Sequence, residues 1–258
     1  MRRIVISAAA GVPPDAAGVL ARVVAQRDAT VLAPAAWFPA LTGPGGVRPA
    51  PALDTEAMIE FPAAAPAGNN WCERLLAALL LLCVSPLLLL LALLVRLDDG
   101  GPAFFVQERF GRNGRPFRLL KFRTMRREAE AQRPALAGSA PAGRPFKVNG
   151  DPRATRSGRW LRRHGLDELP QLLNVVRGEM RLVGPRPLPD YDEQHCSQPW
   201  HRARLDGLPG LTGLWQVSGR NERTFEEMCL LDIWYLRNRT FWLDLQILAR
   251  TLAVIWHG

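Results

Sequence analysis

Two adjacent carboxylates, Asp167 and Glu168, stand where the sequence changes from a turn to a helical pattern. Gly165 precedes them and ends the segment before. Apolar residues follow at helical spacing, namely Leu169, Leu172, Leu173 and Val176. We predict that Asp167 is the N-cap of this helix, where the positive helix end lowers its carboxyl pKa and attracts anions. Taken alone, the pattern fits a plain helix cap better than a reacting group.

Basic residues in four other stretches are candidates to surround these carboxylates. Lys121 and Arg123 follow a predicted strand, and Arg162 precedes the carboxylates by about one helical turn. Arg186 lies between two prolines, and Arg220 ends a glycine-rich loop. Each of them alone is an ordinary solvated charge. Together they indicate a polyanion site that contains one carboxylate nucleophile.

The charge of the whole chain also points to an anionic partner. The chain has 258 residues and a formal net charge of +9. Residues 1–73 hold five Arg and six Asp or Glu, so the positive charge belongs to residues 74–258. A hydrophobic content of 48% excludes a disordered or collagen-like chain. Nucleic acid, anionic lipid headgroups and phosphorylated substrates all remain open as partners at this point.

The cysteines predict neither disulfides nor a metal site. The four cysteines show no paired spacing, and Cys83 lies inside a leucine run. We therefore expect reduced thiols in a chain that faces a reducing compartment. His195 and His201 flank Cys196 without the spacing of metal ligands, so no metal is expected there.

A run of 21 uncharged, mostly apolar residues, Leu75–Val95, is long enough to cross a membrane. Arg74 and Arg96 flank this run, and Ser85-Pro86 stands at its centre. A proline inside a helix predicts a kink. The run is either a kinked spanning helix or a helix that enters the membrane and returns on the same side. Arginine at both ends slightly favours the return, since positive charge prefers the cytoplasmic side.

We divide the chain into a small N-terminal extension, 1–69, and a main domain, 70–258. The extension predicts strands at Ile4–Ser7 and Thr30–Leu32, a helix at Asp15–Gln26 and then a Pro-rich linker. We assign no chemistry to it.

The main domain predicts a β-hairpin after the apolar run, because Asn113-Gly114 lies between two alternating segments. The other expected elements are an Arg- and Glu-rich helix at about Thr124–Gln132, a loop over 134–150, and amphipathic helices at about Phe225–Leu236 and Leu243–Ile255. The tryptophans of the last two helices suit either a membrane surface or core packing.

Five motifs occur in one order over residues 70–256. They are Ser85-Pro86, Lys121-Phe-Arg-Thr-Met, Leu166-Asp-Glu-Leu-Pro-Gln-Leu, Val183-Gly-Pro-Arg-Pro and Pro209-Gly-Leu-Thr-Gly-Leu-Trp-Gln-Val-Ser-Gly-Arg. In the order and the residues of these motifs, the chain resembles the bacterial sugar transferases, the small monotopic phosphoglycosyl transferases that begin bacterial glycoconjugate assembly.

The resemblance implies an α+β, mainly helical fold with a membrane-embedded re-entrant helix at about 74–97, a cytoplasmic helical core and a small β-hairpin. It implies transfer of a sugar-1-phosphate from a nucleotide sugar, with uridine expected, to polyprenyl (undecaprenyl) phosphate, with Mg²⁺. The enzyme would lie on lipid of the bacterial inner membrane with its active site on the cytoplasmic face. The reaction would be the first membrane step of exopolysaccharide, capsule or lipopolysaccharide O-antigen assembly. A homodimer stays open.

The resemblance also assigns roles to the candidate residues. Asp167 matches the family's nucleophile and a metal ligand, and Glu168 matches its partner. The positions that match motifs for phosphate or nucleotide binding are Lys121, Arg123, Arg162, Arg186 and Arg220. The residues around Trp215 resemble those of family members that transfer glucose or galactose phosphate more than those of members that transfer N-acetylated sugars.

Two other functions are weighed against this transferase. A membrane-anchored module that binds nucleic acid fits the charge, but the aromatic residues stand beside leucines and not among the basic clusters, as base stacking requires. We therefore expect no nucleic-acid partner. An anchor without activity is disfavoured by the intact Asp167-Glu168 pair, because an ionised carboxylate can attack phosphorus when cations neutralise the diphosphate.

Overall fold

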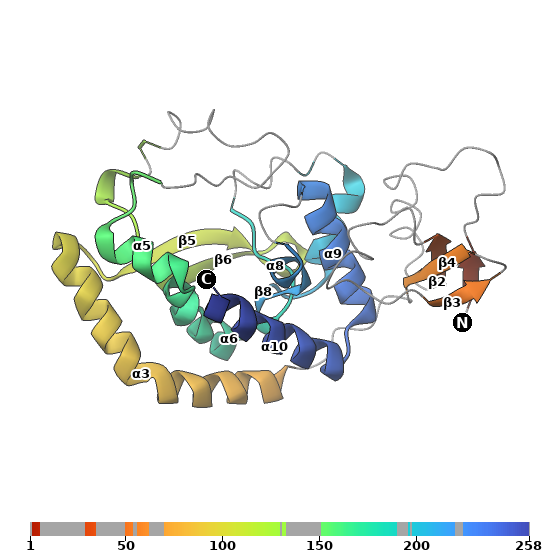
Figure 1. Cartoon of the computed structure of the whole chain (residues 1–258), viewed down its shortest axis with the longest axis horizontal. Helices are drawn as coiled ribbons and strands as arrows, with labels where there is room; N and C mark the ends of the chain where they lie inside the picture. The colour runs from red at the N-terminus through yellow and green to blue at the C-terminus, as the bar shows by residue number, and fades with distance from the viewer. Residues whose placement is uncertain are drawn as a thin grey trace.

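The computed structural model describes residues 2–5, 29–34, 50–53, 56–61, 70–129, 131–132, 151–189, 196, 198–219 and 224–257 (Figure 1). The helix predicted at Asp15–Gln26, the loop predicted over 134–150 and Arg220 lie outside these residues. The described part is mostly helical, with small β-sheets and one long apolar helix, which confirms the coarse fold class.

The apolar run forms one helix, α3 (Trp71–Asp99), slightly longer than the predicted 74–97. The helix continues through Pro86, and Ser85 Oγ donates a hydrogen bond to the Leu82 carbonyl at 2.7 Å. Figure 1 shows α3 bent near the middle of its length, the part that contains this proline. The bend confirms the predicted kink, because proline removes one helical hydrogen bond and crowds the preceding turn.

One side of α3 packs on the main domain along both halves of the helix. Ala77 belongs to the larger hydrophobic core, and Leu91 and Val95 form a second core with Phe122 and Leu161. Among the described residues, α3 is the one helix long and apolar enough to cross a membrane. Its other side exposes a row of leucines: Leu75, Leu76, Leu79, Leu80, Leu82, Leu87, Leu89, Leu90, Leu93, Leu94 and Leu97.

The predicted hairpin is confirmed in β5 (Phe104–Phe110) and β6 (Pro116–Phe122), which pair antiparallel. Its turn, η2 (Arg112–Gly114), holds Asn113 and Gly114 at φ values of 56° and 71°. Glycine and asparagine tolerate this left-handed region better than other residues, which is why Asn-Gly predicted the turn. β6 packs against the segment that carries the two carboxylates.

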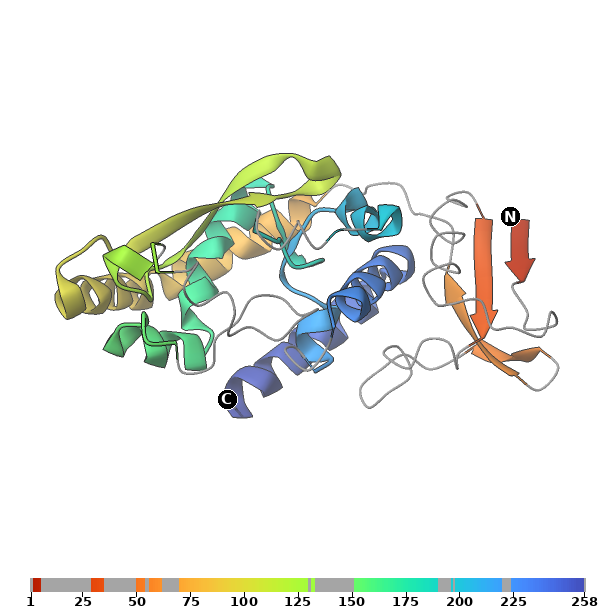
Figure 2. The same ribbon diagram turned by 90° about the horizontal axis from the view of Figure 1, so that it is seen from above.

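The rest of the main domain alternates short helices and turns. Its elements are η3 (Arg127–Ala129), α5 (Arg156–Arg163), η5 (Leu166–Gln171), α6 (Leu172–Arg177), β7 (Arg181–Val183), η6 (Pro199–Asp206), β8 (Gly210–Thr212), α8 (Leu214–Val217), α9 (Phe225–Asn238) and α10 (Phe241–His257). The parallel pair β7–β8 was not predicted. From above, the hairpin lies along one side of this domain and α10 along the opposite side (Figure 2).

The two C-terminal helices are confirmed, whereas the helix predicted at Thr124–Gln132 is wrong. Of residues 124–129 and 131–132, which the structure describes, only the short η3 is helical. The backbone instead pairs with a later segment, through a bridge between Met125 and Ala154 and a 2.9 Å hydrogen bond from Arg126 N to the Arg153 carbonyl. The charged sequence has no apolar stripe that would hold a helix against the core.

The N-terminal strands form a separate four-stranded sheet in the order β1-β2-β4-β3. β1 (Arg2–Val5) and β2 (Ala29–Pro34) are parallel, close to the two predicted strands. β3 (Ala50–Leu53) and β4 (Glu56–Phe61) lie where we predicted a Pro-rich linker, so that part of the prediction is wrong. β4 itself contains no proline, and it satisfies its backbone by pairing with β2.

Candidate active site

The carboxylate pair lies in a 3₁₀ turn between α5 and α6. Gly165 is the N-cap of η5, with φ of 65°, and Asp167 and Glu168 lie in its first turn without capping a backbone N–H through their side chains. The N-cap position predicted for Asp167 is therefore wrong. Only glycine readily adopts this left-handed conformation, so Gly165 ends α5 and re-aims the chain for the carboxylates.

Asp167 is a half-buried carboxyl with an elevated proton affinity. Burial raises its pKa to about 6, and the neighbouring charge of Glu168 adds to the rise, while Lys121, Arg162 and Arg186 oppose it. The lowered pKa that the sequence predicted is therefore wrong, because burial and a like charge outweigh the end of one short 3₁₀ turn. The Asp167 side chain makes no hydrogen bond or ion pair with any residue that the structure describes.

Lys121 approaches the pair from strand β6. Burial lowers the pKa of its ammonium to about 8, and the charge of Arg109 lowers it further, whereas Asp167 and Glu168 raise it. The Nζ atom lies 5.2 Å from the centre of the Phe105 ring, a cation–π contact that helps to fix the side chain. A lysine with this pKa is a cation near neutral pH and loses its charge in mild alkali.

Arg186 is the cation in direct contact with the pair. Its Nη2 atom lies 3.1 Å from Glu168 Oε1 in a half-exposed ion pair. Buried Arg204 donates a 2.6 Å hydrogen bond to the Arg186 carbonyl and forms a 2.6 Å ion pair with buried Asp232. The two flanking prolines and this buried pair together hold the backbone that carries Arg186.

Arg162 and Arg123, which we predicted as substrate-binding cations, lie differently. Arg162 Nε donates to Thr124 Oγ1 at 2.8 Å, and the charge of Arg162 acts on Asp167. Arg123 is buried, pairs with both carboxylate oxygens of Asp99 and donates to the Pro102 carbonyl at 2.7 Å. We therefore leave Arg123 out of the candidate site and assign it to holding the end of α3.

Asn174 is a structural centre of the site that the sequence did not reveal. This fully buried amide accepts a hydrogen bond from Leu120 N at 3.1 Å and donates at 2.7 Å to both the Arg118 carbonyl and Glu179 Oε2. It thereby joins α6, which follows the carboxylates, to β6, which carries Lys121. Only the three-dimensional pairing of these two elements marks this asparagine among other polar helix residues.

The glycine-rich stretch before Arg220 is a packing device in the described residues. A side chain at Gly210 would overlap the backbone of Gly184 beside Arg186, so β8 can approach β7 this closely only with glycine. Trp215, which carried the preference for glucose or galactose, is buried in the larger core.

The carboxylate pair fits a magnesium ion that arrives with a substrate. The described residues hold no group of three or more His, Cys, Asp and Glu side chains that could enclose a metal. Mg²⁺ is usually held by one or two carboxylates and completes its shell with water and substrate phosphates. The repulsion between Asp167 and Glu168, visible in the raised pKa, would be relieved by such a cation.

A partly buried carboxylate among cations, next to an exposed apolar helix, is the arrangement expected of a membrane-associated enzyme that acts on phosphorylated substrates. Residues 66–258 match the family model of the bacterial sugar transferases, so the chain belongs to that family.

Relatives with assigned names agree with this membership. The chain is 46% identical to a galactosyl transferase of Streptococcus agalactiae over 162 residues, 62% of this chain and 36% of the relative. It is 42% identical to an undecaprenyl-phosphate galactose phosphotransferase of Salmonella typhimurium over 69% of this chain and 38% of the relative. The chain thus spans little more than a third of these two proteins. A UDP-glucose:undecaprenyl-phosphate glucose-1-phosphate transferase of Caulobacter vibrioides is 39% identical over 81% of this chain and 73% of the relative.

Proposed function

We propose that the protein transfers a hexose-1-phosphate from a UDP-sugar to undecaprenyl phosphate through a covalent sugar-phosphoryl intermediate on Asp167. The observation that carries this proposal is a half-buried carboxylate with a pKa raised to about 6 that faces Lys121, Arg162 and Arg186. A partly desolvated carboxylate that makes no hydrogen bond is a better nucleophile than a solvated one, and it remains mostly ionised at neutral pH.

In the first step an Asp167 carboxylate oxygen attacks the β-phosphorus of the UDP-sugar. The bond from that phosphorus to the bridging oxygen breaks, and uridine monophosphate leaves with the electron pair. In the second step a phosphate oxygen of the lipid attacks the same phosphorus, and the Asp167 carboxylate is released. Lys121, Arg162 and Arg186 attract the anionic substrates and stabilise the charge that develops at phosphorus.

Glu168 has a supporting role in this scheme, because its ion pair with Arg186 fixes the position of that guanidinium. Mg²⁺, held by Asp167 and Glu168, would supply further neutralisation of the diphosphate. Arg220, which lies outside the described residues, stays a prediction as a phosphate contact.

The way α3 is attached supports a helix that enters the membrane and returns. Near its start, Glu73 pairs with Arg239 at 2.7 Å. At its end, Asp98 accepts a 2.6 Å hydrogen bond from Ser157 Oγ, and Asp99 pairs with Arg123. Both ends of the helix are thus fixed to one domain, and the exposed leucines lie between them. A helix held in this way fits one leaflet better than a full crossing.

The exposed part of α10 would lie at the membrane surface. Phe241 and Trp242 are 73% and 69% exposed near its start, whereas Trp234 of α9 is buried. Tryptophan and phenylalanine on an exposed helix face favour the headgroup region. Of the two roles that the sequence left open for these tryptophans, core packing therefore holds for Trp234.

We place the enzyme at the bacterial inner membrane, with the active site on the cytoplasmic face and the polyprenyl phosphate at headgroup depth. The names of the relatives support glucose or galactose as the sugar. Exopolysaccharide assembly is supported as the pathway class by a relative from Rhizobium meliloti that is named an exopolysaccharide production protein and is 40% identical over 71% of this chain.

The test is a panel of UDP-sugars incubated with the purified protein, Mg²⁺ and undecaprenyl phosphate, scored by release of uridine monophosphate. Intact-mass analysis of enzyme mixed with the donor alone should show an adduct of one hexose phosphate. Glu168→Gln should still form this adduct, and Asp167→Asn should not. Absence of an adduct, together with kinetics that require both substrates at once, would show direct transfer instead.

A further inference from the structure

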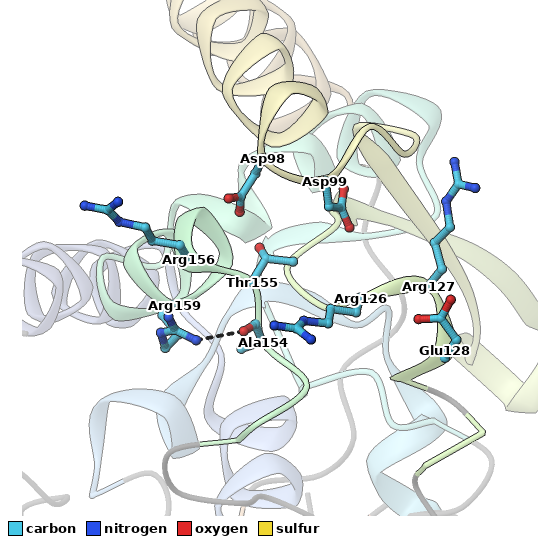
Figure 3. Close-up of a pocket in the computed structure, with 9 residues that line it drawn as sticks. All are labelled: Asp98, Asp99, Arg126, Arg127, Glu128, Ala154, Thr155, Arg156 and Arg159. Carbon is cyan, nitrogen blue, oxygen red and sulfur yellow. Dashed lines mark hydrogen bonds between the residues drawn. The ribbon is translucent and has the colours of Figure 1, made fainter.

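A cavity of about 420 Å³ lies at the end of α3, and neither carboxylate of the pair lines it (Figure 3). Its walls come from the last turn of α3, from η3 with the residue before it, and from the start of α5. It shares none of its lining residues with the candidate active site. The last four residues of α5, Trp160–Arg163, separate its lining from the turn that carries Asp167, a length of about 6 Å.

Four arginines line this cavity: Arg126, Arg127, Arg156 and Arg159. Figure 3 shows the side chains of Arg126 and Arg159 extending towards one another, whereas those of Arg127 and Arg156 point outward on either side. Arg159 Nη1 donates to the Ala154 carbonyl at 2.8 Å. The side chains of the other three make no hydrogen bond or ion pair with any residue that the structure describes.

Three acidic residues line the cavity, Asp98, Asp99 and Glu128, and none of them forms an ion pair with the four arginines among the residues that the structure describes. Asp99 is paired with Arg123, which is not part of the lining. Asp98 Oδ2 accepts hydrogen bonds from Ser157 N at 2.9 Å and Ser157 Oγ at 2.6 Å. Asp98 therefore already accepts the hydrogen bonds that the N-terminus of α5 offers through Ser157. An anionic ligand would accordingly be attracted by the arginines and not by this helix N-terminus. Unpaired guanidinium groups around a cavity are suited to a phosphate group.

The position of the cavity indicates which phosphate it meets. The exposed leucine face of α3 ends at Leu97, 75% exposed, and the cavity begins at the next residue, Asp98. If α3 lies in the membrane, its charged last turn lies where apolar chains give way to headgroups. The phosphates of anionic phospholipids are concentrated at this depth.

We propose that this cavity is a second phosphate-binding site, distinct from the carboxylate pair, and that it holds the headgroup of an anionic phospholipid. Arg126 and Arg159 would contact the phosphate. Occupation would fix the end of α3 at headgroup depth and so set the height of the active site relative to its lipid substrate. This inference rests on the membrane placement in the proposed function.

The test uses the full chain in phosphatidylcholine nanodiscs that contain phosphatidylglycerol with a photoreactive headgroup. After irradiation, mass spectrometry should locate the label on peptides that line the cavity. Arg126→Gln combined with Arg159→Gln should reduce this labelling about tenfold, the loss of charge-assisted contacts. The matched control, Arg118→Gln with Arg202→Gln, removes two exposed charges outside the cavity and should leave labelling unchanged.

Two further measurements separate the outcomes. Flotation with vesicles reports membrane placement, and failure of the native chain to float would overturn both this placement and the lipid site. If the chain floats and the cavity variant is labelled as strongly as the control, only the lipid site is overturned. Titration with uridine monophosphate by calorimetry tests whether the cavity instead binds the phosphate of a soluble molecule. If the cavity variant binds uridine monophosphate more weakly while its lipid labelling is unchanged, the cavity is a site for a soluble phosphate and the lipid assignment is overturned. Each single variant repeats the test if the double variant does not fold.

Discussion

Among the adjacent acidic pairs of the chain, Asp98-Asp99 and Asp167-Glu168 both lie near arginines, and the structure uses these two pairs in opposite ways. At the end of α3, Asp98 accepts hydrogen bonds from Ser157, and Asp99 binds the buried Arg123 guanidinium. In η5, Asp167 has no hydrogen-bond partner among the described residues.

This difference separates carboxylates that hold the fold together from one that is left for the proposed catalytic role. A carboxylate with complete partners is held in its ionised form and stabilises the element that carries it. Asp167 instead has a pKa raised to about 6 by burial and by Glu168, with cations near but not bound to it. The protein thus holds this carboxylate in a partly desolvated, repulsive environment, which is typical of a group that a substrate or metal completes.

The largest difference in turnover should separate the Asp167→Asn variant from the Asp99→Asn variant. We expect Asp167→Asn to lower turnover by several orders of magnitude, since the amide cannot form the covalent intermediate. Asp99→Asn should leave the activity of the folded protein within about tenfold and should lower unfolding free energy by about 1–3 kcal/mol, because Arg123 loses its charged partner. Uridine monophosphate release and thermal unfolding of both variants test this, and comparable losses of turnover in both would contradict it.

A second change should loosen the active site without touching a reacting group. Asn174→Leu removes the hydrogen bonds that join α6 to β6, so Lys121 should shift relative to Asp167. A displacement of about 1 Å can reduce kcat about 100-fold. Asn174→Asp keeps the acceptor for Leu120 N but loses the donor to Arg118 and sets a buried carboxylate against Glu179 Oε2, so its kcat should fall at least as far as that of Asn174→Leu. A purely structural role would lower the melting temperature with no change in kcat of the folded fraction.

The pH dependence of kcat/KM should reflect the two shifted groups of the site. Activity should rise tenfold per pH unit up to about 6, as Asp167 ionises, and fall above about 8, as Lys121 loses its proton. Because the two groups interact, the observed limbs belong to the pair. Lys121→Arg keeps the cation at all these pH values, so the alkaline limb should move upward. An alkaline limb unchanged in Lys121→Arg would assign it to another group.

Much of this fold was predictable because the decisive signals are local. An unbroken leucine run, an Asn-Gly turn and amphipathic periodicity predicted α3, the hairpin and the last two helices. The segment after Lys121 was mispredicted because its charged sequence suits a helix, while tertiary pairing of Met125 with Ala154 decides otherwise.

The sequence predicted which residues form the candidate site better than it predicted their pKa values and contacts. Motif spacing placed Asp167, Glu168, Lys121, Arg162 and Arg186 together, and the structure does bring their charges together. The direction of the Asp167 pKa shift was wrong because burial is a property of the assembled domain. Likewise, Arg123 has the same charge as Lys121 two residues away, and only the position of Asp99 shows that it serves α3.

The smallest expected effect concerns stability. The pKa of Asp167 is raised above that of a free aspartate, so the folded state binds its proton more tightly and the ionised carboxylate costs stability. This cost is absent below about pH 4, grows as pH rises and is complete above about pH 6. Asp167→Asn imitates the protonated form, so its melting temperature at pH 7.5 should exceed that of the native protein by about 2 to 4 °C, and the difference should vanish near pH 4. Differential scanning calorimetry across this range measures it. An inactive Asp167→Asn variant with a higher melting temperature at pH 7.5 would show that the ionised Asp167 carboxylate lowers the stability of the native fold. A lower melting temperature at pH 7.5 would show instead that the surrounding cations favour the charged form.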